Sequence, residues 1–322
     1  MTVSMTRAEH KESSAVVKPR ALSKGSRVGI FAPASPAEEA RIRRGLEELR
    51  SLEFLPQDSF VREPEAYFSA SAKSRLDHFR TLLNDPQIAA LIATRGGYGA
   101  NYMLEQLWAQ HDLAPKCIVG YSDITSLQIL LWQKLRLTSL YGPMVAAGLD
   151  AGPAASNGYD KPSFESAVSG SLQNWKINLS AETMQQGAVE GIVLGGCLTL
   201  ITTTLGTPWE LDTSGSILLI EDRGMKPWQI DRALMHLMQA GKFRNVKGIV
   251  LGEFPDCEPP AGSANAKEVC ERVLKPLGVP IIFGAAVGHT PRPMLTLPLG
   301  IRARFTAEGS GTLEFLETAV TP

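Results

Sequence analysis

Residues 117–125 of this chain read Cys-Ile-Val-Gly-Tyr-Ser-Asp-Ile-Thr, and their pattern decides the fold. The apolar run up to Gly120 predicts a buried strand, the residues from Gly120 to Asp123 predict a tight turn, and the apolar residues from Ile124 onward predict a helix. A strand that runs directly into a helix is typical of parallel sheets, because parallel strands need a crossover connection. We therefore expect an α/β protein.

The same order of strand and helix recurs along most of the chain. The first half predicts strands at 27–32, 88–94 and 116–120, and helices at 37–52, 71–84, 100–108 and 124–135. The second half predicts strands at 189–193, 216–220, 247–251 and 279–283, helices at 198–205 and 228–239, and a β-rich tail over 294–316. This alternation predicts doubly wound parallel sheets that bind ligands at the carboxyl ends of their strands.

The length of the chain predicts two domains. With 322 residues, of which 44% are hydrophobic, the chain exceeds what one hydrophobic core usually holds. We expect an N-terminal doubly wound parallel-sheet domain over 25–150 and a smaller C-terminal α/β domain, rich in strands, over 188–322. Residues 151–187 are rich in Gly, Pro, Ser, Asn and Asp and predict a linker region. Residues 1–24 lack the apolar segment of a signal peptide or membrane span, so we interpret them as a disordered extension.

Charge and cysteine content argue against nucleic-acid binding, disulfide bonds and a zinc site. Lys and Arg total 32 against 33 Asp and Glu, and a formal net charge of -1 does not favour nucleic acid as a partner. The four cysteines show no Cys-x-x-Cys pair, which favours buried free thiols over disulfides or a zinc site. These residues are Cys117, Cys197, Cys257 and Cys270. We therefore expect a cytoplasmic protein that binds no metal and no membrane.

Ser122 stands at the apex of the turn in the 117–125 segment. A strand, a tight turn with an apical serine and a helix together describe a nucleophile elbow, in which the helix N-terminus points its free amides at a developing oxyanion. The alternative is that Ser122 or Asp123 caps the helix, because both residue types often do so. The pattern Gly-x-Ser-x-Gly is broken here by Ile124, so both interpretations stay open at this point.

A second motif, Arg95-Gly-Gly-Tyr-Gly99, follows the strand predicted over 88–94. Glycines let the backbone approach a ligand closely because they carry no Cβ. The spacing differs from the Gly-x-Gly-x-x-Gly of a dinucleotide-binding loop. A backbone amide of Gly97 that helps to form an oxyanion hole fits the motif better, and a simple tight turn is the alternative.

Two further candidates follow apolar strands in the second half of the chain. Glu221 comes directly after such a strand, where a buried carboxylate needs hydrogen-bond partners. Orienting a histidine is one such use, and a structural ion pair with Arg223 or Arg232 is another. His289 lies in a glycine-flanked exit from a strand, which makes it the candidate for a general base among the five histidines.

Together these motifs resemble the LD-carboxypeptidase family of serine peptidases, which also includes enzymes that inactivate peptide-nucleotide antibiotics of the microcin C kind. The resemblance extends from about Gly25 to Leu316. It rests on the segments Arg95-Gly-Gly-Tyr-Gly99, Gly120-Tyr-Ser-Asp123, Gly195-Gly196, Leu205-Gly-Thr-Pro208, Ile220-Glu-Asp222, Ile230-Asp-Arg232, Gly288-His289 and Leu295-Thr-Leu-Pro-Leu-Gly300.

The resemblance implies a catalytic triad with Ser122 as nucleophile, His289 as general base and Glu221 as the carboxylate that orients it. The amides of Gly97 and Asp123 would form the oxyanion hole, and the active site would lie between the two domains. It also implies a homodimer. A triad of this kind needs no metal and no cofactor, because Glu221 would orient the imidazole and the amide pair would hold the oxyanion. Its substrate would be a small cell-wall peptide, a muropeptide, from which it removes the terminal D-alanine during cell-wall recycling.

Three positions depart from the family pattern and bear on substrate preference. Cys197 follows the Gly195-Gly196 pair, where relatives tend to have asparagine. Met225 and Trp228 interrupt positions where relatives have an acidic residue and a tyrosine. These departures leave the implied triad intact.

Three alternative functions stay open on the sequence alone. Cleavage of a microcin C-like antibiotic is the first, although the chain has no long insertion between Leu211 and His289, which favours the muropeptide branch. A two-lobed small-ligand-binding protein would use the glycine motif as an anion nest and Ser122 as a helix cap. A cysteine-dependent amidotransferase is disfavoured, because Cys117 lies inside the predicted strand and not at the turn.

Overall fold

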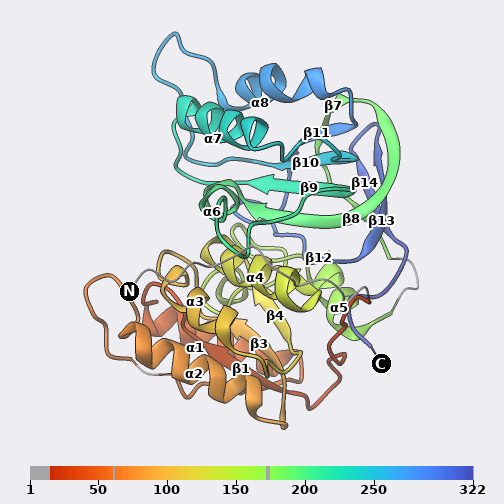
Figure 1. Cartoon of the computed structure of the whole chain (residues 1–322). Coiled ribbons are helices and arrows are strands. Elements are labelled where there is room, and N and C mark those ends of the chain that lie inside the picture. The colour runs from red at the N-terminus through yellow and green to blue at the C-terminus, as the bar shows by residue number, and fades with distance from the viewer. Residues whose placement is uncertain (1–14, 61, 172–174, 322) are drawn as a thin grey trace.

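The computed structural model describes residues 15–60, 62–171 and 175–321. Within these residues the chain forms two lobes, each built around one sheet (Figure 1). The N-terminal part of the chain forms the lower lobe of Figure 1, and most of the C-terminal part forms the upper lobe.

The first sheet is parallel except at one edge. Its parallel strands are β1 (Arg27–Phe31), β2 (Leu55–Gln57), β3 (Ile88–Ala93), β4 (Cys117–Gly120) and β5 (Ser139–Tyr141). The connecting helices are α1 (Glu39–Ser51), α2 (Ala72–Asn84), α3 (Asn101–Ala109) and α4 (Thr125–Leu135). At the edge, β12 (Leu297–Leu299) pairs antiparallel with β5. Across the described strands the order is β12-β5-β4-β3-β1-β2, so the segments that follow β3 and β4 lie side by side.

The second sheet has a parallel centre and antiparallel flanks. The parallel strands are β8 (Gly187–Cys197), β9 (Ser216–Glu221), β10 (Gly248–Gly252) and β11 (Ile281–Ala285). The antiparallel strands are β6 (Lys176–Asn178), β7 (Glu182–Gln185), β13 (Arg302–Ala307) and β14 (Thr312–Phe315). The helices α6 (Leu198–Thr203), α7 (Pro227–Gln239) and α8 (Ala266–Leu274) follow β8, β9 and β10. The order of the described strands is β6-β14-β13-β8-β9-β10-β11-β7.

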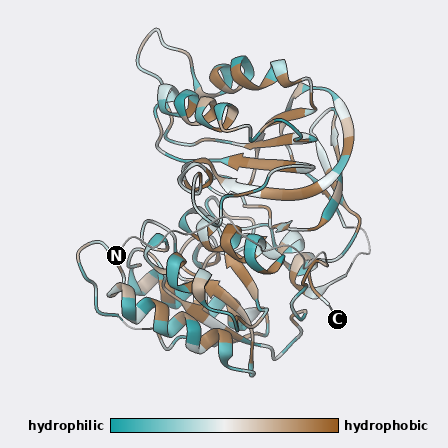
Figure 2. Ribbon diagram, in the orientation of Figure 1, coloured by the Kyte–Doolittle hydropathy of each residue, from teal (hydrophilic) through white to brown (hydrophobic). Residues whose placement is uncertain are grey.

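The central strands are apolar because they are covered on both faces. Every residue of β4, β9 and β10 is buried. In Figure 2 the central strands are brown, whereas the outer helices carry teal residues. Along α7, for example, Ile230, Leu234 and Leu237 are buried at helical spacing and polar residues lie between them.

The predicted α/β fold with two domains is confirmed, and one strand is placed differently from the prediction. The three residues of β12 come from the segment expected to form the C-terminal domain, yet they complete the first sheet beside β5. A three-residue strand is too short to show a periodicity, and its pairing partner is not encoded locally.

The segment 151–187, predicted as a linker region, differs from that prediction because it contains regular structure. It holds α5 (Lys161–Ser169) together with β6 and β7. The side chain of Asp160 caps α5 by accepting a hydrogen bond from the Ser163 amide at 2.8 Å, and Phe164 is fully buried. These elements are short, which explains why they give no sustained periodicity in a polar, glycine-rich sequence.

The predicted disordered extension covered residues 1–24, of which 1–14 lie outside the described residues. Residues 15–24 instead pack against the folded chain, so that part of the prediction is wrong. The Leu22 side chain is buried, and its amide donates a hydrogen bond to the carbonyl of Val168 at 2.8 Å. Thr321 donates to the carbonyl of Pro19 at 2.8 Å, so the two ends of the described chain lie together.

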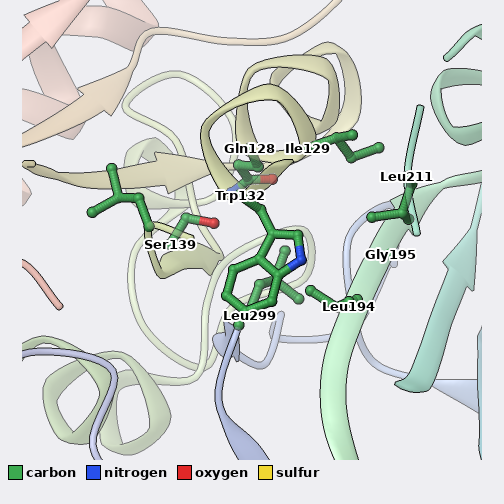
Figure 3. Close-up of a pocket in the computed structure, with 10 residues that line it drawn as sticks. Gln128, Ile129, Trp132, Ser139, Leu194, Gly195, Leu211 and Leu299 are labelled. Carbon is green, nitrogen blue, oxygen red and sulfur yellow. The ribbon is translucent and has the colours of Figure 1, made fainter. Parts of the chain in front are cut away.

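Trp132 of α4 marks a contact between the two lobes. Figure 3 shows it close to Leu194 of β8 and Leu299 of β12. A Cβ on Gly300 would lie 2.7 Å from the indole ring, so only glycine permits this approach. The space left among these side chains is about 10 Å³, room for about one water molecule at most.

The thiol prediction holds for all four cysteines, each of which is buried and free. Burial raises the pKa of Cys117 and of Cys270 to about 12, so both stay as neutral thiols. No helix within the described ranges is long and apolar enough to cross a bilayer.

The contact between α1 and the loop after β5 provides a test of the fold. Gly→Ala in a helix normally stabilises by about 1 kcal/mol. At Gly45, however, the new Cβ would collide with the Val145 carbonyl oxygen. We therefore expect Gly45→Ala to lower the free energy of unfolding by about 1–3 kcal/mol, as overpacking does. Urea denaturation measures it, with Arg43→Ala on the exposed face of α1 as control, and a stabilised Gly45→Ala variant would contradict the contact.

Candidate active site

A cavity of about 680 Å³ lies where the two lobes meet. The first lobe contributes the turn after β4 and the glycine loop after β3. The second lobe contributes the segments after β9, β10 and β11. Both Ser122 and His289 line this cavity. The carboxyl ends of parallel strands from both sheets therefore converge on one space, as is usual for ligand sites in doubly wound folds.

Ser122 lies on a strained turn between β4 and α4. Its φ of 62° is in the left-handed region, which residues other than glycine rarely adopt. With Asp123 and Ile124 it forms a short 3-10 turn, and no side chain caps the start of that turn or of α4. The geometry agrees with a nucleophile elbow and not with Ser122 as a helix cap.

The glycine loop packs directly against this elbow. A Cβ on Gly96 would lie 2.7 Å from the Ser122 Cβ and 2.9 Å from its Oγ, so a larger residue cannot fit there. Gly97 has a φ of 108°, and a Cβ on it would collide with Ser35. The Ser35 hydroxyl accepts a hydrogen bond from the Tyr98 amide at 3.2 Å, which holds the loop in place. The described residues provide no hydrogen-bond acceptor for the Gly97 amide, which is left to donate to a ligand.

Asp123 ties the elbow to the glycine loop through its side chain. Its Oδ2 accepts a hydrogen bond from the Ala100 amide at 2.8 Å, at the start of α3. Burial raises the pKa of this carboxyl to about 6, although that hydrogen bond and the charge of Arg75 oppose the rise. The buried Arg75 guanidinium also donates to the Gly99 carbonyl at 2.7 Å. Asp123 therefore does not cap α4 but fixes the glycine loop relative to the elbow.

Glu221, at the end of β9, is fully buried and hydrogen bonded on both carboxylate oxygens. Its Oε2 accepts from the His289 amide at 2.9 Å and lies 2.8 Å from His289 Nδ1. Its Oε1 accepts from the Tyr141 hydroxyl at 2.5 Å. When Nδ1 carries the proton donated to Glu221, the neutral imidazole presents Nε2 as an acceptor. The carboxylate therefore sets both the orientation and the tautomer of the histidine.

Two glycines make room for the Glu221–His289 pair. A Cβ on Gly252 of β10 would lie 2.5 Å from the Glu221 Cβ. A Cβ on Gly288 would collide with the Glu221 carboxyl group, and Gly288 also has a φ of 62°. The glycine that precedes the histidine thus allows its backbone amide to reach the carboxylate.

Burial and charge act in opposite directions on the pair. Burial lowers the pKa of His289, but the charge and hydrogen bond of Glu221 raise it to a net value above 6.5. Burial raises the pKa of Glu221, but the charge of His289 and the hydrogen bonds from His289 and Tyr141 bring it below 4.5. The Tyr121 ring packs edge-on against the imidazole, with 5.1 Å between the ring centroids. This environment stabilises a protonated imidazole beside a carboxylate, as a general base requires.

The predicted site residues come together, with one contact absent. Ser122, Gly97 and His289 line the cavity, and Glu221 lies behind His289. Within the described ranges no hydrogen bond joins the Ser122 hydroxyl to the imidazole, and such bonds often form only when substrate binds. In the same residues, no group of three or more His, Cys, Asp or Glu side chains is placed to hold a metal ion.

The ion-pair alternative for Glu221 does not agree with the contacts. Arg223 pairs with Asp256 at 2.6 Å. Arg232 lies over the Trp228 ring, with 5.0 Å from its guanidinium carbon to the ring centroid. Both arginines therefore have other partners, whereas Glu221 is bound by His289 and Tyr141.

Sequence reasoning missed Tyr141 and Arg75, which support the site from behind. Tyr141 ends a three-residue strand that pairs with β4, and its position at a strand exit is the signal that could have identified it. Arg75 lies inside α2, where its charge suggests an exposed position, yet it is almost fully buried. No local pattern indicates that burial.

The three departures from the family pattern lie outside the cavity lining. Cys197 is buried at the end of β8, and its amide donates to the Thr125 hydroxyl at 3.2 Å. The Met225 sulfur lies 3.7 Å from the Thr199 hydroxyl. Trp228 is 55% exposed on α7. None of the three is among the described residues that line the cavity.

Comparison with known proteins identifies the family. Residues 28–142 match the model of the LD-carboxypeptidase N-terminal domain, and residues 190–305 match that of the LD-carboxypeptidase C-terminal domain. A probable murein peptide carboxypeptidase of Bacillus subtilis is 32% identical over 306 residues, which cover 92% of this chain and 94% of that protein. The chain belongs to the LD-carboxypeptidase family. The resemblance is confirmed, and the protein is a serine-type peptidase that hydrolyses peptide bonds.

Two further proteins are similar to this chain. The microcin C7 self-immunity protein MccF of Escherichia coli is 30% identical over 315 residues, covering 87% of this chain and 90% of that protein. The crystal structure of a muramoyltetrapeptide carboxypeptidase from Oxalobacter formigenes has a TM-score of 0.78 at 24% identity, covering 92% of this chain and 100% of that one. The structural likeness shows a common fold.

The hydrogen bond from Tyr141 to Glu221 leads to a testable expectation. Tyr141→Phe leaves one oxygen of a buried carboxylate without its donor, which costs about 1–3 kcal/mol of stability. It also loosens the carboxylate that orients His289, and a misplaced catalytic group can cost on the order of 10²-fold in rate. We expect kcat/KM to fall by about 10- to 100-fold, as measured by amino-acid release from a peptide substrate.

Tyr159→Phe is the matched control, because the Tyr159 hydroxyl also donates to a glutamate, Glu48, at 2.6 Å. Glu48 lies on α1, and neither residue is part of the described cavity lining. The control should lose stability with kcat/KM within about twofold, since no group that orients the imidazole is touched. Equal rate losses in the two variants would contradict a specific role for Tyr141.

Proposed function

We propose that this LD-carboxypeptidase uses Ser122 as nucleophile, His289 as general base and Glu221 as the orienting carboxylate. The observation that supports it most directly is the 2.8 Å contact between Glu221 Oε2 and His289 Nδ1, behind a cavity that Ser122 and His289 both line. The positive φ of Ser122 adds to this support, because strained backbone at a turn exposes a nucleophile.

In the proposed mechanism, His289 Nε2 accepts the proton of Ser122 as Oγ attacks the scissile carbonyl. The imidazolium that forms is stabilised by Glu221 and then gives its proton to the leaving amine. The resulting acyl-enzyme is hydrolysed when His289 activates a water molecule in the same way. The low pKa of Glu221 keeps its charge in place throughout.

The amides of Gly97 and Asp123 are proposed to bind the oxyanion. Asp123 is the second residue of the 3-10 turn that leads into α4, where amides have no acceptor within the helix. The close packing of Gly96 on Ser122 brings the glycine loop next to the same atom. Two fixed backbone donors at a developing charge supply a large part of the rate enhancement in acyl transfer.

The proposed substrate is a muropeptide, from which the enzyme removes a terminal D-alanine that follows the L-centre of a diamino acid. Support comes from the names of the Bacillus subtilis and Oxalobacter formigenes relatives. We further propose that the enzyme is a homodimer acting in the cytoplasm during peptidoglycan recycling, as the family resemblance implies. Cleavage of an antibiotic like microcin C is the second candidate, favoured by the relative from Escherichia coli.

Two epimeric tetrapeptides test the proposed substrate. Inverting the terminal Cα exchanges its methyl and carboxylate relative to the scissile amide, and small misplacements of a near-attack geometry can cost on the order of 10²-fold. We expect kcat/KM for release of D-alanine to exceed that for L-alanine by at least this factor, with the released amino acid measured by mass spectrometry. Comparable values for the two peptides would contradict the muropeptide proposal.

Ser122→Ala supplies the control for the mechanism. The variant should show no release above background, because no acyl-enzyme forms, while its circular dichroism spectrum stays that of the wild type. Turnover by a folded Ser122→Ala variant would rule out the serine mechanism.

The pH dependence follows from the shifted pKa of His289. The base must be neutral, so kcat/KM falls as pH drops through the pKa of His289, which Glu221 holds above 6.5. In Glu221→Gln the charge that contributes most to raising the pKa of His289 is lost, while burial still lowers that pKa, so the fall of kcat/KM on the acid side should move to lower pH. The maximum of kcat/KM, reached where His289 is neutral, should fall by roughly 10³- to 10⁴-fold, by analogy with other triads. If the fall of kcat/KM on the acid side stays at the same pH or moves to higher pH, Glu221 does not set the pKa of His289.

A further inference from the structure

The charged side chains that line the cavity are mostly arginines. Arg41, Arg95 and Arg223 line it, whereas Asp256 is the one acidic residue of the described lining. Such an excess of guanidinium groups favours an anionic substrate. Which arginine is available depends on its partners.

Two of the three arginines are already paired with carboxylates. Arg41 Nε lies 2.6 Å from Asp150, whose side chain is 4% exposed. Arg223 Nε lies 2.6 Å from Asp256. An ion pair of this kind neutralises the guanidinium and occupies part of its donor fork.

Arg95 is different, because no carboxylate within the described residues pairs with it. Its Nη1 donates to the Pro36 carbonyl at 3.2 Å, which positions the side chain and leaves its Nε and Nη2 hydrogens for other acceptors. Its charge is therefore not neutralised by the protein.

Arg95 is also close in the chain to the reacting atoms. It directly precedes Gly96, whose backbone packs against the Ser122 Cβ and Oγ, and Gly97, whose amide is a proposed oxyanion donor. In a peptide whose last bond is cleaved, three bonds separate the scissile carbonyl carbon from the terminal carboxylate carbon, a distance of roughly 3–4 Å. A side chain that binds the terminal carboxylate must therefore lie close to the nucleophile.

We propose that Arg95 binds the terminal carboxylate of the leaving amino acid and thereby restricts the enzyme to the last peptide bond. This inference rests on the proposed function, because it assigns the subsite of the leaving residue. A guanidinium matches a carboxylate with two parallel N–H donors, and an amide or a continuing peptide chain offers no such partner. The pairs of Arg41 and Arg223 leave them less suited to this role.

The test compares one tetrapeptide with a free terminal carboxylate and the same peptide with a terminal carboxamide. The wild-type enzyme should prefer the acid in kcat/KM by roughly 10- to 100-fold, the range expected for hydrogen bonds to a charged group. Arg95→Ala should bring this ratio close to one, mainly by raising KM for the acid, because binding is lost in both ground and transition states. Arg223→Ala, at an arginine already paired with Asp256, should keep the wild-type ratio.

Arg95→Lys provides a second variant in case Arg95→Ala fails to fold. Lysine keeps the charge but loses the planar fork, so the ratio should lie between those of the wild type and the alanine variant. An unchanged acid-to-amide ratio in folded Arg95→Ala or Arg95→Lys would overturn the proposal.

A third peptide separates the two carboxylates that a muropeptide can carry. Replacing a diamino acid that bears a side-chain carboxylate with lysine removes that charge and keeps the terminal one. Arg95→Ala could abolish the preference for the diamino acid over lysine and still preserve the acid-to-amide ratio. In that case Arg95 binds the side-chain carboxylate of the diamino acid, and the proposal that it binds the terminal carboxylate is wrong.

Failure of the proposed function gives a different result. In that case the wild-type enzyme releases no D-alanine from any of the peptides. If only the Arg95 proposal is wrong, the wild-type enzyme still releases D-alanine, and Arg95→Ala does not change the acid-to-amide ratio of kcat/KM.

Discussion

The site depends on the hydrogen bonds of one buried carboxylate, that of Glu221. It lies at the end of β9 in the second sheet and accepts a hydrogen bond from Tyr141 at the end of β5 in the first sheet. A carboxylate removed from water needs protein donors on its oxygens, and losing one is costly. Movement of one lobe away from the other would break this bond. The charge therefore helps to hold the lobes at the separation that places His289 and Ser122 on one cavity.

Close backbone approach is the second condition for the site, and glycines meet it on both sides. In the first lobe Gly96 packs on the Ser122 side chain, and in the second lobe Gly252 and Gly288 pack on Glu221. A methyl group at any of these positions would collide with Ser122 or Glu221, which are two members of the proposed triad, and small misplacements of reacting groups can be costly. The glycines of the loop after β3 have no side chains that could pack and hold the loop in place. Asp123 holds the loop instead, by accepting a hydrogen bond from the Ala100 amide at the start of α3.

The lobes are also connected by segments from distant parts of the chain. β12 returns from the second lobe to complete the first sheet, and the residues around Pro19 pair with those around Thr321. The first lobe therefore contains chain from both halves of the sequence. A relative rotation of the lobes would have to disrupt the hydrogen bond between Tyr141 and Glu221.

The sequence by itself determined the local features of this protein. Strand and helix periodicity predicted most elements of both sheets, and the motifs at strand exits predicted Ser122, Gly97, Glu221 and His289, because these patterns depend on residues that are neighbours in the chain. Only the tertiary structure decided that Glu221 binds His289 and not an arginine. The hydroxyl that completes its hydrogen bonding belongs to Tyr141, 80 positions away, and pairing over such a separation is set by how the two sheets pack.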